Sequence, residues 1–271
     1  RIPTPSSPRG ARIRRTGTTV MATATFLFHG ELAQFLGREK RGSAFSHSCA
    51  RAATIKHAIE SLGVPHTEAG RLTVNDQAAT LSRIVREGDV IEVFPHHATD
   101  AFSGETPIFI ADAHLGGLAR LLRMLGFDTL FENEYTDRQI MEIAGRERRV
   151  LLTRDRELLK CRDVLRGCFV HARKPEAQLK EVVVRYALAR HAQPFTLCLH
   201  CNFRLEAAAR SAVAKCVPEP IVERYAEFVC CAGCRRIYWQ GSHWERMRAM
   251  LGGILAEALP VYSSSTNDER R

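Results

Sequence analysis

The sequence predicts an α/β domain with a parallel sheet flanked by helices, preceded by a smaller α+β domain and followed by a cysteine-containing unit. Apolar, strand-like runs alternate with helical patterns between residues 107 and 192, as in a parallel sheet with crossover helices. Strand-like runs surround a single helical pattern between residues 22 and 97. Two Cys-x-x-Cys pairs follow after residue 193.

The chain is basic and has the composition of a globular protein. Its 271 residues are 45% hydrophobic, and 39 Lys and Arg against 30 Asp and Glu give a formal charge of +9. A basic surface suits a polyanionic partner, because each phosphate that it neutralises releases a counterion. The alternative is a solvated basic surface. No run approaches the roughly 18 to 20 apolar residues that span a bilayer, so no membrane partner is expected.

Both ends of the chain are expected to be disordered. Residues 1–21 form a basic arm rich in Pro, Arg, Ser and Thr. This arm has no apolar segment, so it is not a secretory signal, and Met21 is a candidate for the true start. Residues 261–271 form a polar tail.

The first domain is predicted at residues 22–97. Residues 23–28 alternate in hydrophobicity as a strand does, and residues 54–62 form a short amphipathic helix. Residues 72–74 lead into a turn at Asn75 and Asp76, and residues 90–94 form a closing strand. This order is that of a small α+β domain. A linker is expected at residues 98–106, where turn-forming residues prevail.

The central domain, at residues 107–192, is predicted to contain four strands and four helices. The strands are short apolar runs, expected at residues 107–111, 129–131, 150–153 and 168–171. The helices are expected at residues 115–125, 137–148, 157–160 and 175–189. Regular alternation of strands and helices predicts a parallel sheet.

Three aspartates are predicted to lie at one edge of this sheet. Ligands of an open parallel sheet bind beyond the carboxyl ends of its strands. Asp112 directly follows the first strand, Asp137 opens the helix after the second, and Asp155 follows the third. Three converging carboxylates would repel one another unless a cation lay between them. Hard oxygen ligands favour Mg²⁺ or Mn²⁺, which can activate water for displacement at a phosphodiester.

Other charged residues near this edge are predicted to have supporting roles. The cations expected to meet phosphates are Arg154, Arg156 and Arg173. The candidates for a further ligand or its partner are Glu132, Glu134 and Glu157. Two histidines at this edge, His114 and His171, stay outside the predicted site. Asp128 and Asp163 precede strands and are predicted to be structural. The alternative for Asp112 and Asp155 is that they only cap the helices that follow them.

Four of the nine cysteines form a predicted zinc site. Cys198 and Cys201 make one knuckle and Cys231 and Cys234 a second, and two knuckles close a tetrahedral structural site. Unpaired buried thiols or a redox pair are the alternatives. Cys230 adjoins the second knuckle, but the spacing selects Cys231. Metal-binding cysteines of this kind indicate a reducing compartment, and hence a cytoplasmic location.

The zinc ribbon and a C-terminal helix are predicted at residues 193–260. The gap between the knuckles is long, so an inserted helix is expected at residues 219–227. Cations and aromatic rings combine after the second knuckle, as in binders of single-stranded nucleic acid. These residues are Arg235, Arg236, Tyr238, Trp239, His243 and Trp244. The alternative is that the rings pack under the zinc site. Ser242 and Glu245 form a predicted capping box for a helix to Ala258.

Two stretches of the central domain closely resemble the mut-7 C-terminal RNase family. They are FIADAHLGGLARLLRMLGFDT at residues 109–129 and VLLTRDREL at residues 150–158. The resemblance covers residues 107–250 and implies a PIN-like fold with an acidic metal site. The acids of that site correspond to Asp112, Asp137 and Asp155. The resemblance also places the second zinc knuckle before RRIYW at residues 235–239.

The first domain resembles the ubiquitin-like (β-grasp) domain that often precedes this RNase family. The resemblance rests on IESLGVPHT at residues 59–67 and REGDVIEVFP at residues 86–95. Sulfur carriers and modifiers of this fold end in a free Gly-Gly. This block ends in Phe94-Pro95-His96-His97 and continues into another domain. Carrier chemistry is therefore not expected, and the domain's role is predicted to be docking to RNA, a ribosome or a protein.

Together these features predict a metal-dependent ribonuclease, a PIN-like endonuclease that hydrolyses phosphodiester bonds of single-stranded RNA. The expected cofactors are structural Zn²⁺ and catalytic Mg²⁺ or Mn²⁺, and the expected partners are RNA and the ribosome. The alternative is a catalytically weak or inactive zinc-ribbon adaptor that binds RNA or the ribosome. Such an adaptor would show salt-sensitive RNA binding without metal-dependent cleavage.

Overall fold

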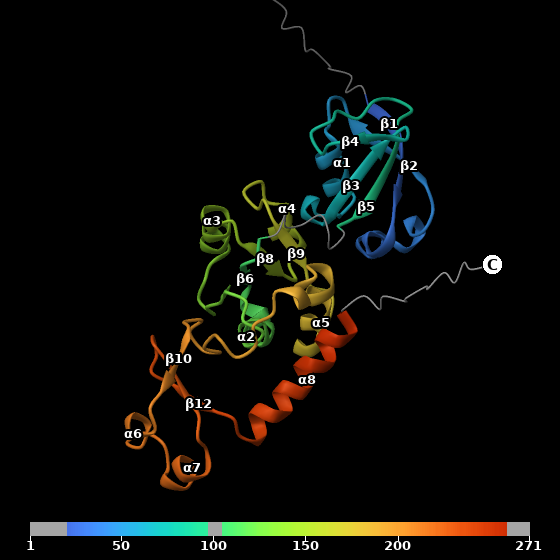
Figure 1. The fold of residues 1–271 in the computed structure, drawn as a ribbon. Helices are drawn as coiled ribbons and strands as arrows, with labels where there is room; N and C mark the ends of the chain where they lie inside the picture. The colour runs from blue at the N-terminus through green and yellow to red at the C-terminus, as the bar shows by residue number, and fades with distance from the viewer. Residues whose placement is uncertain (1–20, 97–104, 259–271) are drawn as a thin grey trace, which may run out of the picture.

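Three units follow one another in the computed structural model (Figure 1). The structure describes residues 21–96 and 105–258. The predicted basic arm up to residue 20, most of the predicted linker and the polar tail lie outside the described residues. Within the described residues, no helix is both long enough and apolar enough to cross a bilayer.

The first domain is a five-stranded β-grasp sheet packed against one helix. Its elements are β1 (Met21–Phe28), β2 (Phe45–Ala50), α1 (Ile55–Ser61), β3 (Ala69–Val74), β4 (Gln77–Ala79) and β5 (Val90–Pro95). The strand order is β2-β1-β5-β3-β4, with β1 and β5 parallel at the centre and the other pairs antiparallel. The prediction of a ubiquitin-like fold is confirmed.

Local sequence explains the start of α1 and the turn between β3 and β4. The Thr54 hydroxyl accepts a hydrogen bond from the His57 N–H and caps α1. Asn75 and Asp76 have φ values of 50° and 63°, so the predicted turn joins β3 to β4 in the left-handed conformation that tight hairpins require. Strand β2 was not assigned from the sequence, because its polar residues resemble a loop.

The central domain is a four-stranded parallel sheet with helices on both faces. Its strands are β6 (Phe109–Ala111), β7 (Thr129–Leu130), β8 (Val150–Thr153) and β9 (Gly167–Phe169), in the order β7-β6-β8-β9. Its helices are α2 (Gly116–Met124), α3 (Asp137–Glu147), α4 (Arg156–Lys160) and α5 (Pro175–Arg185). The prediction of a parallel sheet flanked by helices is confirmed. Helix α5 ends earlier than expected, because Ala187 adopts a left-handed conformation.

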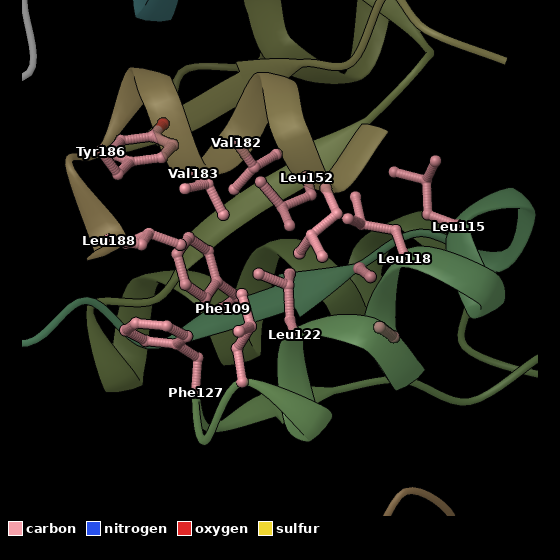
Figure 2. Close-up of a cluster of buried hydrophobic side chains, with 14 of the residues drawn as sticks. Phe109, Leu115, Leu118, Leu122, Phe127, Leu152, Val182, Val183, Tyr186 and Leu188 are labelled. Atoms are coloured by element: carbon pink, nitrogen blue, oxygen red, sulfur yellow. The ribbon is translucent and has the colours of Figure 1, made fainter. Parts of the chain in front are cut away.

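Successive strand residues of the central domain enter different cores. Phe109 and Leu152 pack with α2 and α5, among side chains such as Leu122 and Val182 (Figure 2). Ile110 and Leu151 instead pack with α3 and α4. This period of two with both faces buried explains why the strands read as continuous apolar runs.

The C-terminal unit, here called the ribbon, is a small antiparallel sheet followed by a long helix. The sheet contains β10 (Leu205–Ala208), β11 (Phe228–Cys231) and β12 (Ile237–Trp239) in that order. Two short helices lie in the insertion, α6 (Arg210–Val213) and α7 (Glu219–Arg224), the second where a helix was predicted. Helix α8 (Ser242–Ala258) returns to the central domain and contributes Leu251 to its core (Figure 1). The Glu245 N–H donates to the Gly241 carbonyl, so Gly241 precedes the helix and Ser242 is its first residue. The prediction of a capping box with Ser242 before the helix is therefore wrong.

Candidate active site and metal centre

In the central domain, the chain leaves the neighbouring strands β6 and β8 toward opposite sides of the sheet. From β6 the chain crosses to β7 on one side, and it later returns to β8 on the other side. Ligands of such sheets bind beyond the carboxyl ends of these two strands. Asp112 directly follows β6 and Asp155 follows β8. These two predicted site residues therefore flank the switch point.

Thr153 links the two acids. Its hydroxyl donates to Asp112 Oδ2 over 2.8 Å and accepts from the Asp155 N–H over 3.0 Å. Thr153 is fully buried at the end of β8, so its hydroxyl needs such partners. From the sequence, Thr153 is predicted only as a strand residue. A hydroxyl at the last buried strand position, before an Arg-Asp pair, is the signal that could have identified it.

Both acids also cap helices, as the alternative interpretation expected. Asp112 Oδ1 accepts from the Ala113 N–H over 2.6 Å. Asp155 Oδ1 accepts from the Glu157 N–H over 2.8 Å and from the Leu158 N–H over 3.4 Å. A carboxylate has about four lone-pair positions, so these bonds leave each acid able to accept a further ligand.

A cavity of about 480 Å³ opens beside the two acids. It is lined by Asp112, His114, Arg154, Asp155, Arg173 and Gln178. His114 and Gln178 were outside the predicted constellation. Gln178 is buried, and its side chain donates to the Ala172 and Arg173 carbonyls over 3.1 and 3.4 Å. We call these lining residues the acidic cavity.

Asp137 lies outside the lining of the acidic cavity. It is exposed at the first position of α3, behind a capping box between Thr136 and Gln139. Burial raises the pKa of the Cys161 thiol, and the charges of Asp137, Asp163, Asp155 and Glu157 contribute to the same rise. The three aspartates do not form a group whose oxygens all lie within 4.8 Å of one another.

The three arginines predicted to meet phosphates have different surroundings. Arg154 Nη1 donates to the carbonyls of residues 170–172, so this side chain braces the cavity wall. Arg156 lies over the Phe35 ring of the first domain, 5.0 Å from its centroid. Arg173 is exposed and lines the acidic cavity.

The two aspartates predicted to be structural lie apart from this cavity. Asp128 receives two hydrogen bonds from Arg149, at 2.7 and 3.2 Å. It also accepts from the Asn202 amide over 2.6 Å. Asp128 thus holds the amino ends of the strands together, while Asp163 is exposed before β9.

The four predicted zinc ligands come together in the ribbon. Ligand atoms of Cys198, Cys201, Cys231 and Cys234 all lie within 4.8 Å of one another. Among the described residues, they are the only group of three or more His, Cys, Asp or Glu side chains that meets this distance. Four thiolates this close suit a tetrahedral zinc ion. The neighbouring Cys230 is outside the group.

Hydrogen bonds tune the thiols of this cluster. Burial alone would raise the pKa of Cys198, but the Tyr238 hydroxyl and two backbone N–H groups lower it to about 6. The Tyr238 oxygen lies 3.1 Å from the sulfur. Burial and the other thiols instead raise the pKa of Cys234 to about 12. Thiolates this close would repel one another, and a bound cation would relieve that repulsion.

The first knuckle is joined to the central domain by side chains from both units. Arg123, which is buried, donates to the carbonyls of Thr129, Leu199 and His200. Asn202 Oδ1 accepts from the Thr129 N–H over 3.1 Å. The knuckle is therefore attached at the amino end of β7, whereas the acidic cavity lies beyond the carboxyl ends of β6 and β8.

Residues of the ribbon that were predicted to contact RNA are partly used for packing. Trp239 lies near Phe228, with ring centroids 6.5 Å apart, and Trp244 lies 4.9 Å from the Phe195 ring. Three other residues of this group, Arg235, Arg236 and His243, are exposed.

Two family models match the chain. A model described as Mut7-C RNAse domain matches residues 107–251, and one described as Mut7-C ubiquitin matches residues 21–100. No curated protein matches the chain. Among solved structures, the chain is similar to the crystal structure of H. volcanii small archaeal modifier protein 1, with 22% identity and a TM-score of 0.23. That match covers 27% of this chain and 97% of the other.

Proposed function

The chain belongs to the Mut7-C RNAse domain family, and we propose that it is a divalent-metal-dependent endoribonuclease that hydrolyses single-stranded RNA. The family supports a nuclease-like function in general. The observation that carries the finer proposal is the pair of carboxylates, Asp112 and Asp155, at the switch point of the sheet. They line one cavity together with the exposed cation Arg173.

The acidic cavity offers the donor atoms that a hard cation prefers. Asp112 and Asp155 would hold Mg²⁺ or Mn²⁺ through carboxylate oxygens, and Asp137 is the third candidate ligand from α3. When bound, such an ion supplies a more acidic water molecule and neutralises charge on the phosphoryl group. Thr153 keeps the Asp112 carboxylate in place through its 2.8 Å hydrogen bond.

The cations around the cavity fit a polyanionic substrate. Arg173 can bind a phosphate next to the acids, because its side chain is exposed and borders the cavity. His114 lines the same cavity and can donate a hydrogen bond or a proton there. Arg154 is already bonded to three carbonyls, so its role is to hold the wall.

The preference for single strands rests on the ribbon. Arg235 and Arg236 are exposed beside the half-buried Trp239, which combines charge with a ring for stacking. The cysteine cluster would hold zinc as a structural ion, since four thiolates leave no open position for substrate.

An RNA cleavage assay with matched variants tests the proposal. Labelled single-stranded and duplex RNA would be incubated with the full chain and Mg²⁺ or Mn²⁺. We expect cleavage of the single strand, and a loss of at least about 100-fold for Asp112→Asn and Asp155→Asn, since even outer-shell changes cost 10- to 100-fold. Asp163→Asn is the control, because Asp163 is an exposed carboxylate before β9. Cleavage that persists in the Asp112→Asn, Asp155→Asn double variant would exclude the site.

A second candidate function is an RNA- or ribosome-binding adaptor with little or no catalysis. It is favoured by the position of Asp137, which does not line the acidic cavity. An adaptor would bind RNA with strong salt dependence in the same assay and leave it intact.

A further inference from the structure

The first domain covers an edge of the central sheet. Strand β9 is the last in the order β7-β6-β8-β9, so one side of its backbone has no neighbouring strand in that sheet. The carboxylate of Glu68, from the first domain, accepts from the Phe169 N–H of β9 over 2.7 Å. His66 Nε2 lies 3.1 Å from the Val164 carbonyl, just before β9. The edge is thus closed by side chains instead of a strand.

A buried ion pair anchors this contact. The second oxygen of Glu68 lies 2.5 Å from Arg185 of α5, and the Glu68 side chain is fully buried. A buried carboxylate without a partner is strongly unfavourable. The first domain therefore has a defined position against β9 and α5.

A ring from the first domain reaches the wall of the acidic cavity. Phe35 is buried, and its ring centroid lies 5.3 Å from that of Phe169 and 5.4 Å from that of His171. Arg156, at the start of α4, lies over the same ring and donates to the Phe35 carbonyl over 3.3 Å. Phe35 thus contacts both the strand and the segment beyond it.

The segment at residues 170–173, here called the wall segment, carries Arg173 to the acidic cavity. From the cavity side, Arg154 and Gln178 donate to its carbonyls. Glu181 of α5 accepts from its His171 and Ala172 N–H groups, both over 2.9 Å. The Phe35 ring of the first domain contacts the His171 ring of this segment.

We infer that Phe35 is a positioning residue for the acidic cavity, through which the first domain completes the substrate-binding wall of the RNase. This inference rests on the proposed function, since it concerns how Arg173 meets RNA. Without the Phe35 ring, the wall segment keeps only its contacts from the central domain. Arg173 would then be held less firmly, which weakens substrate binding more than the chemical step.

Two readouts on the full chain test this role. The variant Phe35→Leu keeps an apolar side chain in the first domain but removes the ring from His171 and Arg156. Phe45→Leu is the control, because it removes a ring that stacks on Phe28 within the first domain. Arg156→Gln removes the cation that lies over the Phe35 ring and donates to its carbonyl. Because this variant also removes a charge predicted to meet RNA phosphates, only its exchange readout is used.

Backbone hydrogen exchange of the wall segment is the first readout, and steady-state RNA cleavage is the second. For Phe35→Leu and Arg156→Gln, we expect exchange at His171 and Ala172 to accelerate about tenfold, as loss of an aromatic contact predicts. For Phe35→Leu, KM for RNA should rise by a similar factor while kcat stays within about twofold. Phe45→Leu should change neither quantity.

The outcomes separate the two proposals. Exchange at the wall segment that is unchanged by Phe35→Leu, or equally changed by Phe45→Leu, overturns the positioning role whatever the cleavage assay gives. A fall in kcat with constant KM also overturns it. If the wild-type chain cleaves no RNA, the proposed function fails, and the exchange comparison alone decides whether Phe35 holds the wall segment.

Discussion

Replacing Asn202 should destabilise the junction between the ribbon and the central domain. Its side chain makes two hydrogen bonds across that junction, to the Thr129 N–H over 3.1 Å and to Asp128 over 2.6 Å. Glycine is the appropriate replacement, because Asn202 has a φ of 68°, where alanine would add strain of its own. The variant Asn202→Gly therefore removes the side chain without adding backbone strain to the folded state.

The expected loss of unfolding free energy is about 2 to 4 kcal/mol. Thr129 is fully buried, so its unpaired N–H would cost about 1 to 3 kcal/mol. The bond to Asp128 contributes about 1 kcal/mol more. That second contribution is kept small because the Asp128 side chain is 43% exposed and retains its bonds to Arg149.

Urea titration of the zinc-loaded chain, followed by tryptophan fluorescence, measures this loss. The two tryptophans of the sequence, Trp239 and Trp244, lie in β12 and α8 and so report on the ribbon. The matched control is Arg235→Gly, at the equivalent position of the second knuckle, with a φ of 61° and an exposed side chain. A loss for Asn202→Gly below about 0.5 kcal/mol, or equal to that of the control, would refute the reasoning.

Three further predictions concern the Thr153 hydroxyl that links Asp112 to Asp155, the predicted zinc site and the hydrophobic core of the central domain. Thr153→Val should lower the unfolding free energy by about 1 to 3 kcal/mol in denaturant titration, and Thr153→Ser should restore it; equal losses would contradict the hydroxyl's role. Cys231→Ser should lower the zinc content measured by mass spectrometry from about one ion per chain, whereas Cys230→Ser should not; the reverse would contradict the cluster. Leu122→Ala should cost about 2 to 5 kcal/mol, against less than about 0.5 for Leu165→Ala, an exposed leucine.

Patterns of apolar residues were enough to predict most of the fold. Residues 150–153 are fully buried on both faces of the sheet, so their unbroken apolar run predicted β8 with its bounds. Strand β2 was not predicted, because it pairs only with β1 at the sheet's edge and only Cys49 is buried. The early end of α5 depends on the left-handed conformation of Ala187, which no glycine marks.

The candidate site was predictable only where chain position fixes geometry. Asp112 and Asp155 follow neighbouring parallel strands, so the rule for sheet edges placed them near each other. Asp137 is separated from β7 by a loop of six residues, 131–136. The position of β7 therefore does not fix the position of Asp137 relative to the cavity. Arg156 contacts Phe35, 121 positions earlier in the chain, and no local pattern reveals that contact.

The predicted zinc site and the proposed divalent-ion site are expected to act on the protein in different ways, because the ribbon is attached at the amino ends of the central strands and the acidic cavity lies beyond their carboxyl ends. The ribbon is attached at the amino ends of the strands, where Arg149 bonds both Asp128 and the Phe109 carbonyl. Asp112 is three residues further along, so about 10 Å of strand separates the two edges. We therefore expect loss of zinc to affect the acids through the sheet, and loss of a divalent ion from the acidic cavity to leave the ribbon unchanged. A chelator that removes both metals would not separate these effects, but the Asp112→Asn and Cys231→Ser variants would.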